Sequence, residues 1–556
     1  MTEIDPAVSS DATSTETSPL LGQNPTNDAT TYDKKYNDND TAVNDTAVNE
    51  TKKQRISAVA IASGNANDSE NDSENESESE SITPKSKSTA TIWDDVLEVV
   101  KLAVPIFVSN VSWVGKKTTD TALLGHLGQE ALAASALSDL WTSTTAVFLS
   151  GHILGIVSGS LIGGAVGAGN PKLAGIYIQV ACVVVSAVGC GVVVLWNLTE
   201  TVWLWFGSDP EISAMAGTYS RLLSLAIPGI IAFNLLTQFF SAQKILRPEA
   251  TASAMGLVAN LVLGLTLVLG WPIPGFGGFG FAFCPLVTTA VTYVQVAFVV
   301  LVCVGMQRLH EPCWPGLVPH EITRERIRTF SGLYFPAALS GSSDFWRAAV
   351  IGSVAASMGE IDVAVFNTAY RIMWIALIFV NSNAAAAAIN VSLRLGNMDP
   401  HGAKQAACVG IGLAVAVVGV LGWLVLWKSR WFGKIFTNDE EFLDLFVECS
   451  VPFALTLCFM NLAVAIERIP YSMGRSKEVF WMSLVGSWFG QVPAVLILTT
   501  YWRNDLVGLY SGMAIGYFLL TILYAYIVAK RCVARLFAEW SDCGFVIPCD
   551  FLLWIV

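Results

Sequence analysis

Three charged residues interrupt a stretch that otherwise reads as a membrane-spanning helix. In LAVPIFVSNVSWVGKKTTDTALLGHLG, Lys116, Lys117 and Asp120 lie between two apolar runs. An ionisable side chain inside a membrane is costly and faces a cavity or a partner. A helix places both lysines beside Asp120, because residues three and four positions apart share a face. The stretch therefore predicts either a carboxylate that exchanges protons inside the membrane or a permanent ion pair with the lysines.

A second basic residue stands at the same distance from a proline. Lys116 follows Pro105 by eleven residues. Arg347 follows Pro336 by the same interval and has Asp344 three residues before it. Two facing cations would attract an anionic or zwitterionic solute. The alternative is one Asp–Lys pair and one Asp–Arg pair, which need no solute, and the spacing is compatible with both.

A histidine and several aromatic residues are weaker candidates. His152 lies in the second apolar run, where an imidazole relays protons or, alternatively, stays neutral beside a carbonyl group. Trp346 and Tyr370 belong to a group of aromatic residues that could line a pocket for planar organic solutes. Most aromatic residues in such a chain pack against neighbouring helices or face lipid instead.

The composition places these residues in a membrane protein. Hydrophobic residues make up 53% of the 556 residues and charged residues only 14%, whereas a soluble domain carries about 25% charged residues. Residues 1–92 hold 17 Asp and Glu against 7 Lys and Arg, so that they carry −10 of the net charge of −13. The acidic balance thus belongs to the tail, and nucleic acid is not an expected partner. The 11 cysteines lack CxxC spacing and the 5 histidines are dispersed, so we expect no metal site.

Long apolar runs predict twelve membrane-spanning helices, since a span needs about 20 mostly apolar residues. We expect them near 97–124, 131–160, 174–196, 212–240, 249–270, 279–304, 328–357, 362–392, 403–427, 442–468, 478–500 and 507–530. Lysines and arginines gather in the loops on one side, which predicts that both termini are cytoplasmic. The resulting map has a disordered acidic cytoplasmic tail at 1–92, an N-lobe at 93–305, a cytoplasmic inter-lobe loop at 306–327, a C-lobe at 328–530 and a C-terminal tail at 531–556.

The body of the chain is an internal duplication. The two prolines are 231 residues apart, and Gly128 and Gly359 keep that offset. GAGNPKLAG and LGNMDPHGA follow at an offset of 227, which pairs Gly169 with Gly396. Six spans per half is an even number, so both halves should have the same orientation, with a central cavity between them. This is the architecture of a transporter.

The tail carries two candidate signals. Its low-complexity, polar composition cannot bury enough apolar surface to fold. Several of its serines have an acid three residues on, as in NDSENDSENESESES, which suits acid-directed kinases; the alternative is an unmodified solvating tail. The stretch ETSPLL, with Glu16, Leu20 and Leu21, resembles the acidic dileucine signal by which adaptors sort proteins to vacuoles, lysosomes or endosomes.

The order and spacing of these segments resemble one transporter family. VPIFVSN, DTALLGHLGQEALAASAL, GAVGAGNPKLAGIYIQ and GEIDVAVFNTAYRI are similar to segments of the multidrug and toxic compound extrusion (MATE) transporters, and the resemblance covers residues 95–530. It implies an all-α polytopic membrane fold of twelve helices in two pseudo-symmetric six-helix lobes. It also implies an antiporter that exports organic solutes against an inward flow of H+ or Na+, with H+ usual in eukaryotic members.

Four positions of the family's site can be compared with this chain. Asp120 matches the acid of the family's first helix, which is a cation or proton site in prokaryotic members. Asn260 matches the fifth helix, but Gly264 replaces the acid that often follows. Asp344 stands where eukaryotic members often have Glu. The acid that plant members often carry in the tenth helix is missing, and Glu467 is the nearest one, closer to the cytoplasm.

The leading hypothesis is a proton-coupled exporter of small organic compounds (drugs, toxins or secondary metabolites) that works by alternating access of the two lobes. We expect the ion to be coupled by Asp120, Asp344 and Asn260, and the substrate cavity to be lined by Lys116, Arg347, Trp346, Tyr370 and Glu467. The expected ion is H+, with Na+ as the alternative, and no cofactor is expected. The alternative functions are a lipid-linked oligosaccharide flippase and an exporter of citrate-like organic anions.

An enzyme is not expected, because the sequence shows no cluster of nucleophile, base or metal ligands at one membrane face. The expected partners are the solute, the lipid bilayer and, at the tail, sorting adaptors and kinases. We expect a monomer in the vacuolar, endolysosomal or plasma membrane.

Overall fold

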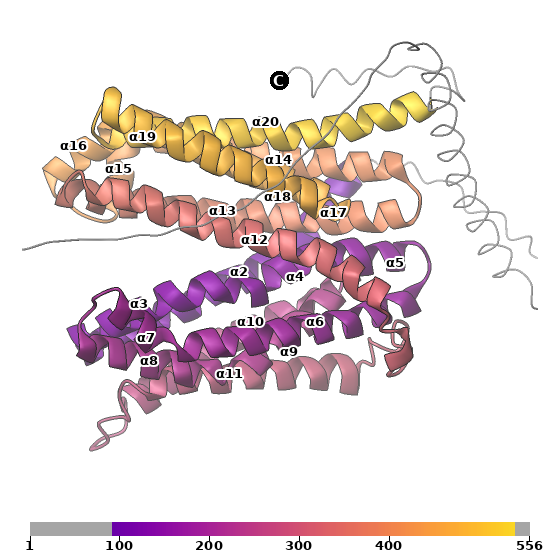
Figure 1. Ribbon diagram of the computed structural model, residues 1–556, viewed down its shortest axis with the longest axis horizontal. Coiled ribbons are helices and arrows are strands. Elements are labelled where there is room, and N and C mark those ends of the chain that lie inside the picture. Colours follow the sequence, from indigo (N-terminus) through magenta and orange to yellow (C-terminus); the bar gives the residue numbers. More distant parts are fainter. Residues whose placement is uncertain (1–91, 540–556) are drawn as a thin grey trace, which may run out of the picture. The chain divides into compact units, whose positions relative to one another are not determined.

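The computed structural model describes residues 92–539, with side chains up to residue 530. Within these residues every regular element is a helix, and the long helices run side by side (Figure 1). The dileucine stretch with Glu16, Leu20 and Leu21, and the serines that suit kinases, lie outside the described residues. Sorting and phosphorylation of the tail therefore stay predictions.

The first half of the described chain, here called the N-lobe, runs from α2 to α11 (indigo to magenta in Figure 1). Its α-helices are α2 (Ile92–Leu127), α3 (Gln129–Ala146), α4 (Gly151–Ser158), α5 (Gly164–Gly167), α6 (Pro171–Asn197), α7 (Thr199–Trp205), α8 (Pro210–Ser224), α9 (Ile227–Ser241), α10 (Arg247–Leu263) and α11 (Phe283–Val299). Short 3-10 or π-helical segments join or extend them at Val147–Leu149, Gly159–Gly163, Gly264–Val268 and Val300–Met306. Through two of these segments, α3, α4 and α5 make one broken span, Gln129–Gly167.

The second half, here called the C-lobe, runs from α12 to α20 (Figure 1). Its α-helices are α12 (Arg324–Ala356), α13 (Glu360–Gly396), α14 (Pro400–Trp427), α15 (Ser429–Lys434), α16 (Glu440–Glu448), α17 (Ser450–Ser472), α18 (Ser476–Leu484), α19 (Val492–Tyr501) and α20 (Leu506–Glu539). A 3-10 turn at Pro319–Glu321 precedes α12, and a π-helical segment at Val485–Gln491 joins α18 to α19.

The described helices agree with an all-α polytopic membrane protein, as predicted. Ten helical stretches are long and apolar enough to cross a membrane, and α8 with α9, which meet at an angle of 47°, make an eleventh. The remaining predicted span corresponds to α12. Its 33 residues are long enough, but they include Asp344, Arg347 and a polar first turn. Composition alone therefore does not identify α12 as a span.

Matching caps at the starts of α6 and α14 fix the register of the repeat. Asn170 caps α6 by accepting a hydrogen bond from the backbone N–H of Leu173, and Pro171 is its first residue. Asp399 and Pro400 do the same for α14. Carboxylate and amide oxygens are preferred at this position because they satisfy free backbone donors of the first turn. The offset here is thus 229, and the predicted pairing of Gly169 with Gly396 at 227 is wrong by two residues.

The corrected register pairs two glycines that touch each other. We call the end of the bundle at which α2 and α12 begin the proximal end, and the opposite end the distal end. At the proximal end, a Cβ on Gly167 would lie 2.2 Å from the carbonyl oxygen of Leu393, and a Cβ on Gly396 would lie 2.4 Å from that of Gly164. Only glycine permits such an approach of two backbones. The lobes therefore meet backbone to backbone at the proximal end.

Helix α2 contacts both lobes along its length. Near its start, Asp95 is 3% exposed and accepts hydrogen bonds from Arg394 of α13 at 2.5 and 3.1 Å. About four turns past Asp95, the Nδ2 of Asn110 donates to the Oγ of Ser382 on α13 at 3.1 Å. Farther along, the polar side chains of α2 bond to α3, α10 and α11. The proximal half of α2 thus contributes to the lobe interface, and its distal half belongs to the N-lobe.

Candidate functional site

The N-lobe has a buried carboxylate that is held by neutral donors. Asp120, 8% exposed on α2, accepts a hydrogen bond from the Nδ2 of Asn260 on α10 at 2.8 Å. Its other oxygen accepts from the Oγ1 of Thr288 on α11 at 3.0 Å. The predicted pair of Asp120 and Asn260 is therefore brought together, and Thr288 completes a site made by three helices.

The two lysines before Asp120 have other partners. The Nζ of Lys117 lies 2.7 Å from the Oδ1 of Asp139 on α3, and the Nζ of Lys116 donates to the Oε1 of Gln295 on α11 at 2.9 Å. The suggested ion pair of Asp120 with these lysines is not formed. The reason is directional: helical side chains lean toward the start of the helix, so lysines that precede Asp120 extend away from it.

The packing around Gly264 leaves no room for an acidic side chain at that position. A Cβ on Gly264 would lie 2.3 Å from the Cδ1 of Leu123, which is 3% exposed and follows Asp120 by one turn. Leu123 therefore takes the space that a longer side chain would need. The second acid that the resemblance led us to consider at this position is thus excluded by the packing of Leu123.

The C-lobe has a carboxylate that is held by a cation. Arg347, 7% exposed, lies 3.0 Å from Asp344 one turn earlier on α12. It also donates to the Oγ of Ser487 at 2.7 Å and to the hydroxyl of Tyr517 on α20 at 3.4 Å, and its guanidinium lies 5.1 Å from the centre of the Tyr517 ring. The Asp344 carboxylate itself is 44% exposed. The Asp–Arg pair that the spacing suggested is therefore formed, with the arginine inside the lobe and the acid at its edge.

The remaining predicted cavity residues differ in their surroundings. Glu467 on α17 is half-buried and lies within electrostatic reach of Asp344 and Arg347. Tyr370 is half-buried and stacks on Phe366, with ring centres 6.1 Å apart, so it packs within the C-lobe. Trp346 is 54% exposed on α12. Glu467 thus joins the polar cluster of Arg347, whereas Tyr370 is part of the apolar packing.

A polar contact between the two lobes joins His152 to Arg468, a residue that the sequence analysis did not single out. His152 was expected either to relay protons or to lie beside a carbonyl group. Its Nδ1 instead lies 2.6 Å from the Nη2 of Arg468 on α17. Thr288, Gln295 and Arg468 were all missed. Only Arg468 had a signal of its own, as a charged residue within a predicted span.

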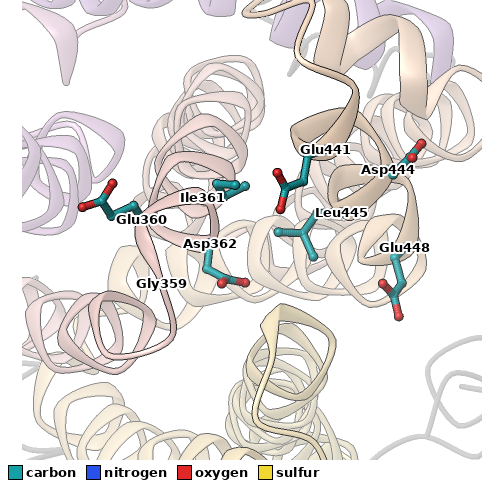
Figure 2. A pocket seen from close by; sticks show the side chains of 8 residues that line it. All are labelled: Gly359, Glu360, Ile361, Asp362, Glu441, Asp444, Leu445 and Glu448. Atoms are coloured by element: carbon teal, nitrogen blue, oxygen red, sulfur yellow. The ribbon is translucent and has the colours of Figure 1, made fainter.

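An open acidic hollow lies at the distal end of the C-lobe, between the start of α13 and α16 (Figure 2). Its volume is about 600 Å³, and it is lined by Gly359, Glu360, Ile361, Asp362, Glu441, Asp444, Leu445 and Glu448. Asp444 pairs with Arg430 at 2.8 Å, and Glu448 pairs with Arg503 at 2.6 Å. Half-exposed pairs of this kind contribute about 0–1 kcal/mol each, so they give the hollow a fixed acidic rim more than stability.

Comparison with known proteins shows to which family the two lobes belong. The MatE family model matches the chain twice, over residues 105–266 and 336–496. The chain belongs to the MatE family. Both matches begin at one of the two prolines that the repeat pairs, so the predicted duplication is confirmed. Members of this family are transporters, and this chain is therefore a multi-pass membrane transporter and not an enzyme.

Relatives within the MatE family are distant but span most of the chain. Multidrug and toxin extrusion protein 1 of Danio rerio is 22% identical over 444 residues, covering 78% of this chain and 72% of that protein. A probable multidrug resistance protein NorM of Brucella suis is 25% identical over 459 residues, covering 78% and 93%. The crystal structure of the eukaryotic MATE transporter AtDTX14 superposes with a TM-score of 0.70 at 19% identity, covering 79% of this chain and 96% of that one. These likenesses support efflux transport on the predicted fold.

Proposed function

We propose that this MatE transporter exports small organic solutes in exchange for protons, by alternating access of its two lobes, and that Asp120 is the coupling carboxylate. The observation that carries the proposal is the N-lobe site. Asp120 is buried among three helices and accepts hydrogen bonds only from neutral groups among the described residues. No cation lies within ion-pair distance of this charge, since Lys116 is held by the amide of Gln295 and Lys117 by Asp139, so binding of a proton lowers the cost of burying it. A group of this kind responds to a proton gradient.

Asp344 is the second coupling carboxylate in this proposal, with a weaker role. The guanidinium of Arg347 already compensates its charge at 3.0 Å. A nearby cation favours the ionised form of an acid. Proton binding at Asp344 must therefore compete with a cation in direct contact, whereas the groups that bond to Asp120 are two neutral donors.

The oxygen atoms around Asp120 favour H+ over Na+ as the coupling ion. Besides the carboxylate, the site offers the Oγ1 of Thr288 and the Oδ1 of Asn260, which is buried without a hydrogen-bond partner. Hard cations take about six oxygen ligands in protein sites. With Gly264 in place of a second acid, the described residues offer one charge and few ligands. Na+ is the ion to test next.

Arg347 and Lys116, the basic residues of the two lobes, have different partners, and we propose a different role for each. Arg347 is engaged by Asp344 and needs no solute. Among the described residues, Lys116 donates a hydrogen bond to the amide of Gln295 at 2.9 Å, and Asp120 lies within electrostatic reach. An ammonium held mainly by an amide can still attract an anion, and this observation favours an exporter of organic anions as the second candidate. The proposed orientation places the proximal end in the cytoplasm, in the vacuolar, endolysosomal or plasma membrane.

The test is uptake into liposomes that contain the purified protein under an imposed pH gradient. Two solutes are followed, a fluorescent organic cation and labelled citrate, with wild type, Asp120→Asn and Asp344→Asn. Asp439→Asn is the matched control, because Asp439 caps α16 outside the two polar clusters and asparagine caps a helix equally well. We expect gradient-driven uptake by wild type and the control, and its loss in Asp120→Asn. Uptake that does not depend on the pH gradient but follows a Na+ gradient would contradict H+ as the coupling ion. Uptake that depends on neither gradient would favour a flippase.

A further inference from the structure

A buried arginine of the C-lobe bonds a histidine of the N-lobe. The Nη2 of Arg468 on α17 lies 2.6 Å from the Nδ1 of His152 on α4. The same nitrogen donates to the Oδ1 of Asn381 on α13 at 2.5 Å. Arg468 is only 7% exposed, so these two acceptors replace the water molecules that an exposed guanidinium would bind. The contact joins three helices across the lobe interface.

The contact fixes the protonation state of the histidine. A guanidinium carries five N–H donors and no acceptor, so His152 must accept at Nδ1. The ring is therefore neutral, with any hydrogen on Nε2. A proton on Nδ1 would remove the acceptor and place an imidazolium against a guanidinium. The contact holds only while His152 is neutral.

Among the described residues, no carboxylate forms an ion pair with His152, and the charged group that acts on the ring is Arg468. Helix α4 packs against α9, α12 and α17 and against the segments Val147–Leu149 and Gly159–Gly163. The side chains that α9 brings to Gly151 and Gly155 are the neutral amides of Asn234 and Gln238.

From α12, Tyr334 donates its hydroxyl to the carbonyl of Phe148, and from α17 Arg468 is the charged group that acts on the ring. Glu467 and Tyr471 act on Arg468 from the same helix. The two short segments contain no titratable side chain. Protonation of His152 would thus be opposed mainly by Arg468.

His152 lies where a change in its bonding bears on both lobes. Its residue surface is exposed, and its bonding partner belongs to the other lobe. The contact lies on the same interface as the glycine approach at Gly167 and Gly396 and the hydrogen bond of Asn110 to Ser382. Breaking it removes a polar contact between α4 and α17, which belong to different lobes.

We propose that His152 is a proton-binding group of its own and that its protonation releases α4 from Arg468, so that protons favour opening of the proximal end. This inference rests on the lobe movement of the proposed function but does not depend on the solute or on Asp120. It gives the proton two effects: neutralising a carboxylate in the N-lobe and weakening the closure between the lobes. A proton bound from the distal side would then promote the state that releases it at the proximal side.

The test measures the distance between the proximal starts of α6 and α14 by electron resonance. Spin labels are attached at Lys172 and His401, which are both exposed, through an introduced azido amino acid, so that all native cysteines remain. The full-length protein is reconstituted in liposomes without solute. The ratio of open to closed populations is then followed as the pH falls from about 7.5 to about 4.5, which extends two units below about 6.5, the ordinary pKa of histidine.

In wild type we expect that ratio to rise by roughly tenfold to a hundredfold on acidification, as loss of one hydrogen bond to a charged group implies. His152→Gln keeps an acceptor but cannot take a proton, and it should stay closed at every pH. His152→Lys carries a permanent charge and should be open at every pH. His126→Gln, at an exposed histidine near the distal end of α2, is the control and should respond as wild type does.

A wild-type response in His152→Gln would overturn the proposal, as would a wild type that does not respond at all. If His152→Lys does not fold, the comparison of wild type with His152→Gln still decides. Because no transport is measured, failure of this test is distinguishable from failure of proton-coupled export.

Discussion

Helices α2 and α12 occupy the same place in the repeat but hold their acids in opposite ways. At the offset of 231 that pairs their prolines, Lys116 corresponds to Arg347, whereas Asp120 corresponds to Ile351, which is 3% exposed in the C-lobe core. Asp344 corresponds to an exposed tryptophan seven residues earlier in α2 than Asp120. With a helical rise of about 1.5 Å per residue, the two acids differ in depth by about 10 Å.

The difference in partners matters more than the difference in depth. Asp120 is buried and lacks a cation within ion-pair distance, whereas Asp344 is half-exposed and paired. In the proposed mechanism a proton neutralises the buried acid of the N-lobe, whereas the acid of the C-lobe already has a buried arginine as its partner. We therefore propose that the N-lobe contributes more to coupling than the C-lobe does.

The largest expected effect is a loss of proton-driven uptake in a variant that still exchanges solute. Asp120→Asn should lower gradient-driven uptake by about 100-fold or more while solute-for-solute exchange without a gradient continues, since the lobes can still alternate. Asp344→Asn should lower gradient-driven uptake less than Asp120→Asn does, because Arg347 already favours the ionised form of that acid. Parallel assays of gradient-driven uptake and exchange check this. Equal loss of both activities in Asp120→Asn would break the comparison.

The free energy of unfolding should fall more in Asp344→Asn than in Asp120→Asn, which is the reverse of their order in the loss of uptake. Removing one partner of a buried pair costs about 3–5 kcal/mol, and we expect about 1–2 kcal/mol for Asp344→Asn because that carboxylate is 44% exposed. Asp120→Asn keeps neutral partners and should change stability by about 1 kcal/mol or less. Urea unfolding in detergent, followed by tryptophan fluorescence, gives both values. A larger loss in Asp120→Asn than in Asp344→Asn would contradict the assignment of roles.

A double substitution sharpens the C-lobe side of the comparison. If Arg347 is costly only because its partner is gone, Arg347→Met should recover stability in the Asp344→Asn background. The coupling energy of the double-mutant cycle should be about 1 kcal/mol or more. Simple additivity of the two substitutions would show that the contact at 3.0 Å contributes nothing.

The smallest effect concerns the lysine that helical spacing linked to Asp120. Lys117 pairs with Asp139, and the two side chains are 43% and 39% exposed. Such pairs contribute about 0–1 kcal/mol, so Lys117→Met should leave stability nearly unchanged and keep proton-driven uptake. Loss of uptake in this variant would restore Lys117 as a partner that tunes Asp120.

Much of the fold was predictable because it depends on local patterns. Apolar runs located the spans, as with 174–196 inside α6 and 403–427 inside α14. The prolines and glycines of the repeat gave the two lobes. The error at Gly169 arose because similar letters, GAGN and LGNM, align in two ways, and only the caps at Asn170 and Asp399 distinguish them.

The partners of the site residues could not be predicted from one sequence. Spacing along a helix says which residues share a face, but it does not say that Lys117 reaches Asp139 on the next helix or that Lys116 reaches Gln295. The contact of His152 with Arg468 joins residues 316 positions apart. Such contacts are set by how the helices pack, and charged residues within spans show only that a partner must exist.

The most direct test of the account is to observe which carboxyl group takes up a proton. Infrared difference spectra of the protein in liposomes, recorded between neutral and acidic pH, report the carbonyl stretch of protonated carboxyl groups. We predict a band in wild type that is lost in Asp120→Asn and kept in Asp344→Asn. A band that persists in Asp120→Asn and disappears in Asp344→Asn would move the coupling carboxylate to the C-lobe and contradict the central claim.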